Sequence, residues 1–141
     1  MKKVQFYFLD RNPALKERTR LKLFIEKLFT SEKMKLGNLS YIFCSDEHLL
    51  TINNDFLKHD FYTDVITFDL SSSKNEIEGE VYLSVDRIKD NAKQLGVSFK
   101  EELHRVIFHG ALHLCGYKDK KKEEALIMRS KENKYLKRYL I

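Results

Sequence analysis

The 141-residue chain has only two cysteines, Cys44 and Cys115, and it has no long hydrophobic run. Two cysteines without any sign of secretion give no disulfide framework, so reduced thiols and a cytoplasmic protein are expected. No stretch approaches the roughly 20 apolar residues of a membrane helix, so no membrane partner is expected. The amino-terminal segment begins Met1-Lys2-Lys3, but the apolar run after it is too short for a signal peptide.

The composition is that of an ordinary globular protein. Hydrophobic residues make up 43% of the chain and charged residues 33%. Because the chain has neither repeats nor a linker-like segment, one domain over residues 1–141 is predicted. Lysine and arginine number 26 against 21 aspartates and glutamates, a net charge of +5. This mild surplus permits a phosphate-rich partner without requiring one.

Hydrophobic periodicity predicts a mixed α/β fold, a small four-stranded mixed sheet with helices packed against it. The expected strands cover residues 3–9, 39–44, 63–70 and 79–85. The expected helices cover residues 13–29, 46–56, 87–95, 99–115 and 123–139. The last two strands are joined by a short polar segment, which favours an antiparallel pair.

Three of the helix starts are predicted from capping residues. Asn12-Pro13 places Asn at the N-cap and Pro at the first helical position. Asp86 is expected to cap the helix that ends before Gly96. Ser98 and Glu101 form the S-x-x-E capping box that opens the next helix.

That helix ends in the stretch from His109 to Asp119, which predicts a metal site. His109 and His113 are four residues apart, so both imidazoles lie on one helix face and can reach one ion. Gly116 suits the backbone turn that ends a helix. Asp119 follows on the returning loop, where its carboxylate is a candidate third ligand.

The spacing matches the frame of the metzincin motif, H-E-x-x-H-x-x-G-x-x-H, with two substitutions. Gly110 replaces the general-base Glu of those peptidases, and Asp119 replaces the third His. Alternatives remain open for neighbouring residues. Asp119 can also cap the last helix, and Cys115 is expected to pack rather than ligate. His104 is expected to be structural and His48 to lie at the surface.

Three protein ligands leave a coordination position for water, as in a catalytic zinc site. One Zn²⁺ ion per chain is expected, and the carboxylate ligand leaves other divalent transition metals open. Such an ion can activate a water to attack a phosphodiester. His59, Asp60 and Asp64 are candidate general bases by residue type alone. The candidate RNA-binding lysines are Lys58, Lys118, Lys120 and Lys121.

The chain also resembles the YbeY-type metal-dependent endoribonucleases. Their signature H-G-x-L-H-L-x-G-Y-D-H corresponds to H-G-A-L-H-L-C-G-Y-K-D over residues 109–119, which departs at the last two positions. Residues 63–68, T-D-V-I-T-F, resemble the family's T-D-V-L-S-F strand. Residues 79–84, G-E-V-Y-L-S, resemble its G-D-[IV]-x-[IV] strand.

The resemblance implies a small α/β fold, a zinc-like ion and a single-strand-specific endoribonuclease activity. It implies action on small-subunit rRNA, including its 3′ end, a part in ribosome quality control, and association with ribosome assembly factors. The metal ligands it implies are His109, His113 and Asp119. The family's RNA-facing Arg corresponds to Leu57 here, beside Lys58 and His59.

Two other functions compete with this hypothesis. The first is a non-catalytic rRNA-binding or ribosome-assembly factor whose metal is structural. The second is a metallopeptidase-like hydrolase, which Gly110 disfavours because it removes the usual general base.

Overall fold

The structure is a computed structural model that describes residues 3–140. Its strands are β1 (Val4–Phe8), β2 (Leu36–Cys44), β3 (Val65–Asp69) and β4 (Ile77–Ser84). Its helices are α1 (Arg18–Ser31), α2 (Asp46–Leu57), α3 (Val85–Leu95), α4 (Phe99–Leu114) and α5 (Lys122–Tyr139). The predicted mixed α/β class and the predicted order of elements are confirmed. No helix within the described residues is long and apolar enough to cross a bilayer.

The four strands form one mixed sheet in the order β1-β2-β4-β3. Strands β1, β2 and β4 are mutually parallel, and β3 pairs antiparallel with β4 at one edge. Val65 of β3 lies opposite Leu83, which confirms the predicted antiparallel pair. Strand β3 therefore leaves one edge of its backbone facing away from the sheet, beside α4.

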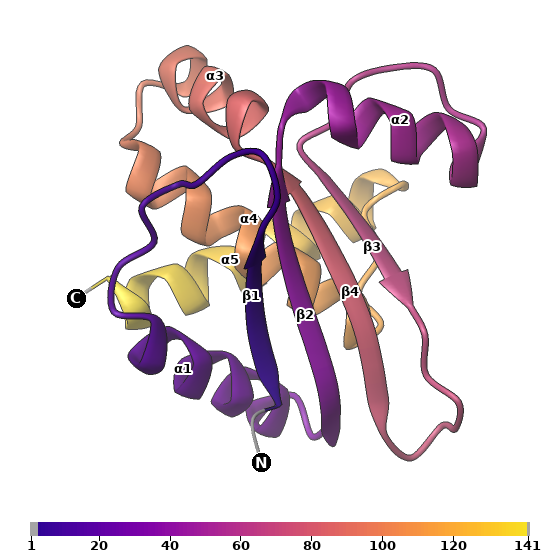
Figure 1. Ribbon diagram of the computed structural model, residues 1–141. Coiled ribbons are helices and arrows are strands. Elements are labelled where there is room, and N and C mark those ends of the chain that lie inside the picture. The colour runs from indigo at the N-terminus through magenta and orange to yellow at the C-terminus, as the bar shows by residue number, and fades with distance from the viewer. Residues whose placement is uncertain (1–2, 141) are drawn as a thin grey trace.

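The main core fills the space between one face of the sheet and helices α1, α4 and α5 (Figure 1). Alternate residues of β2 and β4 point into it, as the period of two requires. The sheet contributes Tyr41, Phe43, Val81 and Leu83 to this core. A smaller buried cluster lies under α2 on the opposite face, and it contains Cys44, Leu49, Ile52 and Ile66.

The predicted start of the first helix is wrong. Helix α1 begins at Arg18, five residues after Pro13. The Asn12 side chain accepts a hydrogen bond from the Ala14 amide at 2.8 Å, so it stabilises a local turn. Ala14 and Glu17 then have positive φ angles of 55° and 52°, which interrupt any helix there.

Two other boundaries differ from the prediction because of tertiary partners. Strand β2 begins at Leu36 rather than Leu39, because its first residues pair with β4. Helix α3 is capped by Ser84, whose hydroxyl accepts from the Arg87 amide at 3.0 Å. The Asp86 carboxylate, expected as the cap, accepts instead from the Asp46 amide at 2.9 Å.

Helix α4 packs closely against the sheet at Gly110. A Cβ atom there would lie 2.7 Å from Val81 Cγ1, so any side chain would overlap the buried strand. The position that carries Glu in metzincins therefore faces the sheet core in this chain. The face of α4 that carries His109 and His113 is left to line a cleft beside β3.

Candidate metal centre

The end of α4 brings Asp119 back to the two histidines. Ser98 caps the start of the helix, and its hydroxyl accepts from the Glu101 amide at 3.0 Å, as predicted. Helix α4 ends at Leu114, and Gly116 follows with a φ of 104°. This φ favours glycine, so the chain turns sharply there, and the returning loop carries Asp119 onto the histidine face.

The Asp119 carboxylate contacts both imidazoles. Its Oδ2 atom is 3.3 Å from His109 Nε2 and 3.5 Å from His113 Nε2. All three potential ligand atoms lie within 4.8 Å of one another. Two ligands bound to a tetrahedral zinc at about 2.1 Å lie roughly 3.4 Å apart. The group of His109, His113 and Asp119 therefore fits a zinc-like ion in both donor type and spacing.

Both histidines are held so that Nε2 faces Asp119. His109 Nδ1 donates to Glu132 Oε2 at 2.6 Å. His113 Nδ1 donates to the carbonyl oxygen of Tyr117 at 2.9 Å. Hydrogen bonding of the second ring nitrogen fixes the tautomer and the ring orientation of metal-binding histidines. Both Nε2 lone pairs are thus available on the side of Asp119.

Glu132, from α5, was missed by the sequence analysis. Its Oε1 atom accepts from Arg105 at 3.0 Å and from Arg129 at 3.3 Å, while its Oε2 accepts from His109. The Glu132 side chain is only 7% exposed. The sequence did hold a signal, since Glu132 lies four residues after Met128 in the buried row of α5. A carboxylate in such a row requires buried partners.

These contacts set the charges of the group. Burial lowers the pKa of His109, but Glu132 and Asp119 outweigh it and raise that pKa above its ordinary value. Burial and the neighbouring His109 lower the pKa of His113. Burial raises the pKa of Glu132, but the hydrogen bonds from His109 and Arg105 hold it below its ordinary value. Glu132 is therefore ionised at neutral pH.

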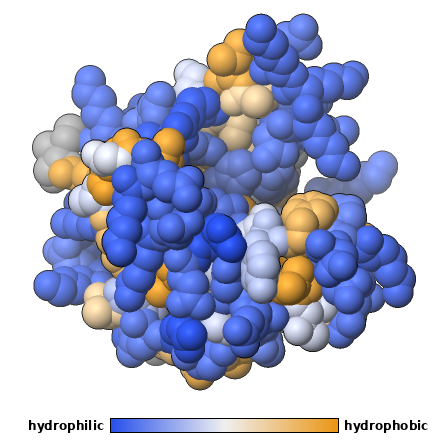
Figure 2. Space-filling view, turned by 90° about the horizontal axis from the view of Figure 1, so that it is seen from above, coloured by the Kyte–Doolittle hydropathy of each residue, from blue (hydrophilic) through white to orange (hydrophobic). Residues whose placement is uncertain are grey.

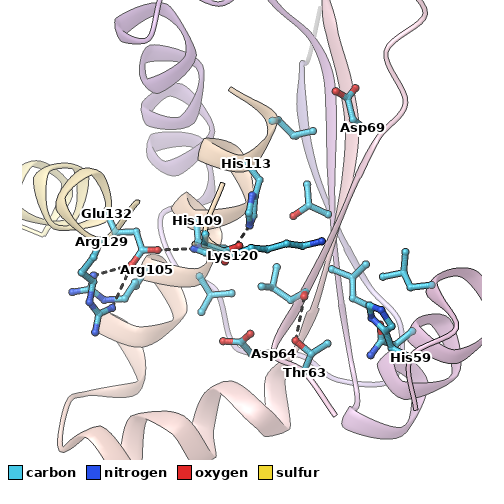
Figure 3. Close-up of a pocket in the computed structure, with 18 of the residues that line it drawn as sticks. His59, Thr63, Asp64, Asp69, Arg105, His109, His113, Lys120, Arg129 and Glu132 are labelled. Carbon is cyan, nitrogen blue, oxygen red and sulfur yellow. Dashed lines mark hydrogen bonds and ion pairs between the residues drawn. The ribbon is translucent and has the colours of Figure 1, made fainter. Parts of the chain in front are cut away.

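The three residues lie in a cleft of about 820 Å³ between β3, α4, the end of α2 and the middle of α5. His59, Asp64 and Lys120, all singled out in the sequence, line this cleft (Figure 3). Leu57, which the sequence resemblance aligned with the family's arginine, lines it too. The remaining predicted residues are exposed and do not line it: Lys58, Asp60, Lys118 and Lys121.

The cleft holds more anionic than cationic side chains. Five carboxylates line it, from Asp64, Asp69, Glu102, Asp119 and Glu132. The arginine and lysine side chains that line it are Arg105, Lys120 and Arg129. Both arginines are paired with Glu132, whereas no described carboxylate pairs with Lys120. Burial raises the pKa of Asp64, which lies near His109. A phosphate entering this cleft therefore needs an additional positive charge.

The neighbouring residues behave as expected. His104 is buried, donates to the Lys100 carbonyl oxygen at 2.7 Å and stacks on Tyr139. His48 is exposed. Cys115 packs against the core and is not one of the three grouped ligands. Helix α5 is capped at Lys121, not at Asp119, so the capping alternative for Asp119 is excluded.

Comparison with protein-family models matches residues 10–140 to the family described as "Endoribonuclease YbeY". The chain belongs to the YbeY family. It is 48% identical over 128 residues to the "Endoribonuclease YbeY" of Cytophaga hutchinsonii, covering 91% of this chain and 90% of that protein. It is 45% identical to the "Endoribonuclease YbeY" of Bacteroides thetaiotaomicron, over 88% of this chain and 89% of the relative.

The fold matches a solved structure as well. The solution structure of TM1509 from Thermotoga maritima superimposes with a TM-score of 0.62 at 27% sequence identity, covering 94% of this chain and 87% of that one. The YbeY resemblance drawn from residues 63–68, 79–84 and 109–119 is confirmed. Residues 63–68 and 109–119 contribute side chains to the cleft, whereas residues 79–84 lie in β4, the strand that pairs with β3.

Proposed function

We propose that this YbeY-family chain is a metal-dependent, single-strand-specific endoribonuclease of the cytoplasm, built as one domain. We propose that it processes small-subunit rRNA, including the 3′ end, and takes part in ribosome quality control alongside assembly factors. The observation that carries the proposal is the position of Asp119 Oδ2, 3.3 Å and 3.5 Å from two imidazole Nε2 atoms. The relatives are named endoribonucleases, which supports the choice of RNA as substrate.

His109, His113 and Asp119 would hold one zinc-like divalent ion. When bound, such an ion lowers the pKa of a water and offsets charge on a phosphodiester. The excess of carboxylates in the cleft supports this dependence, because the side chains alone disfavour an anionic substrate. The negative charge of the Asp119 carboxylate, whose Oδ2 lies 3.3 Å from His109 Nε2, would offset part of the positive charge of the ion.

The other residues of the cleft have supporting roles in this proposal. Glu132 and the Tyr117 carbonyl oxygen hold the two imidazoles in the ligating orientation. Lys120 extends into the cleft (Figure 3) and would hold a phosphate of the RNA in this proposal. Asp64 is the preferred general base, because a carboxylate of raised pKa accepts a proton more readily at neutral pH.

The test is metal analysis combined with RNA cleavage. Wild type, His113→Ala, Asp119→Ala and the control His48→Ala are purified untagged and analysed by mass spectrometry for bound metal. Each is then incubated with a single-stranded RNA and with the same RNA in a duplex. We expect about one ion per chain in wild type and in His48→Ala, with cleavage of the single strand only. Both site variants should lose the metal and the cleavage.

Other results would select other functions. RNA binding without cleavage, with metal retained and needed for thermal stability, would favour an assembly factor with a structural ion. Cleavage that persists in His113→Ala would reveal a contaminating nuclease. Metal retained in Asp119→Ala would remove Asp119 from the ligand set. Protein cleavage that is lost in His109→Ala would restore the metallopeptidase alternative.

A further inference from the structure

Two aromatic rings stand together on the wall of the cleft formed by the end of α2. His59 and Phe61 are stacked, with ring centroids 5.1 Å apart and an interplanar angle of 20°. Both residues line the cleft, yet Phe61 is 56% exposed. A large aromatic side chain that is neither buried nor turned away from the cleft offers apolar area to a ligand.

The loop that carries this pair is tied down by one buried side chain. Asn53 of α2 is only 1% exposed, and its Nδ2 donates to the Phe61 carbonyl oxygen at 2.9 Å. The carbonyl oxygen of Asn53 accepts from the His59 amide at 3.1 Å. Lys58 caps α2 with a left-handed φ of 57°, which turns the chain into this loop. The two rings are therefore pre-positioned before any ligand binds.

The opposite side of the cleft carries the residues proposed to act on the phosphate, which are Lys120 and the three potential metal ligands. Figure 3 shows His59 across from His109 and His113, with Lys120 extending between the two sides. The exposed aromatic face on one side, and Lys120 with the group that would hold a divalent cation on the other, match the two parts of a nucleotide, the base and the phosphate. Seen from the side of α2 and α3, the surface is mostly hydrophilic with small separate hydrophobic patches (Figure 2). Such a surface does not favour a large apolar partner.

We propose that the His59–Phe61 pair is a base-stacking subsite that holds one unpaired nucleobase of single-stranded RNA. This inference rests on the proposed function and adds to it the residues that retain the strand. Stacking is tolerant of base identity but requires an unstacked, unpaired base. A duplex keeps its bases stacked inside the helix, so the subsite also favours single strands over double strands.

The experiment measures binding of a fluorescent six-nucleotide 2′-O-methyl RNA to the metal-loaded protein, with strand integrity checked on a gel. Wild type is compared with Phe61→Ala, Phe61→Tyr and the control Phe56→Ala. Phe56 is 70% exposed on the same helix-loop segment but does not line the cleft. Each protein is also titrated with six RNAs that each lack one base.

We expect Phe61→Ala to bind roughly 5- to 100-fold more weakly than wild type, with Phe61→Tyr and Phe56→Ala near wild type. One abasic position should weaken wild type by a similar factor and leave Phe61→Ala unchanged. Equal binding by wild type and Phe61→Ala would overturn the subsite. The subsite would also be overturned if each abasic RNA weakened binding to Phe61→Ala by the same factor as binding to wild type.

Cleavage assays of unmodified RNA separate this inference from the proposed function. If wild type cleaves and binds RNA but Phe61→Ala does both equally well, the subsite is wrong and the nuclease function stands. If wild type neither cleaves nor binds RNA, both are wrong. Unaltered metal content in Phe61→Ala confirms that the loss concerns the RNA and not the ion.

Discussion

Glu132 is the residue that best tests how the candidate centre is built. Glu132 is not one of the three potential ligands, and it acts on them through its hydrogen bond with His109 Nδ1. Loss of a carboxylate partner of a metal-binding histidine commonly lowers metal affinity about 10- to 100-fold. Glu132→Gln keeps the size of the side chain but removes the charge that favours the ligating orientation.

We therefore expect zinc affinity to fall by about 10- to 100-fold in Glu132→Gln, measured by competition with a chromophoric chelator. Glu123→Gln, on an exposed position of the same helix, is the matched control and should bind as wild type does. Circular dichroism on both variants establishes that the protein measured is folded. An unchanged zinc affinity in folded Glu132→Gln would exclude Glu132 as a positioning residue.

At the scale of elements, the position of the histidines depends on how closely α4 approaches β4. The closest approach is at Gly110, where an added Cβ would lie 2.7 Å and 3.0 Å from the two Val81 methyl carbons. Val81 is completely buried in β4, so it has little room to move. A side chain at position 110 would push the helix away from the sheet, and the histidine face would move with it.

Gly110→Ala is therefore expected to destabilise the protein, because overpacking of about 1–3 kcal/mol exceeds the helix-propensity gain of about 1 kcal/mol. In a Val81→Ala background the same change should be neutral or stabilising, giving a coupling energy of about 1 kcal/mol or more. Urea unfolding of wild type, the two single variants and the double variant measures this coupling energy. Additive effects of the two substitutions would mean that the contact does not limit the approach.

At the scale of the whole molecule, Glu32 joins three elements around the site. It follows α1, and its carboxylate accepts hydrogen bonds from Tyr117 at 2.6 Å, from Tyr135 of α5 and from Lys131 of α5 at 3.4 Å. The same Tyr117 accepts from His113 through its carbonyl oxygen. Burial raises the pKa of Glu32, but Tyr117, Tyr135 and Lys131 outweigh it, so the pKa lies below the ordinary 4.5.

A lowered folded-state pKa means that the charged carboxylate stabilises the fold above about pH 4.5, and that this contribution disappears as the pH falls through the folded-state value. We expect Glu32→Gln to be less stable than wild type by about 1–2 kcal/mol at pH 7. The difference should shrink between pH 5 and pH 3, roughly the range of carboxylate titration. Denaturant unfolding at several pH values checks it, and a constant difference would contradict it.

The sequence by itself determined the parts of this protein that depend on local interactions. The spacing of His109 and His113 requires only one helix, and the turn at Gly116 requires only a backbone that tolerates positive φ. The alternation along β2 and β4 follows from the period of a strand, so the existence of the four strands and the order of elements were predicted correctly, although not every strand boundary was. The resemblance carried by residues 109–119 was confirmed for the same reason, since it lies within one continuous stretch.

Only the tertiary structure decided what depends on residues distant in the chain. Glu132 lies 23 residues from His109, and their contact exists because α5 packs against α4. Strand β2 begins at Leu36 because its first residues pair with β4, about 40 residues later in the chain. His59 and Phe61 face the histidines only because α2 and α4 flank the same strand, β3. Contacts of this kind follow from packing, which no local pattern of residues specifies.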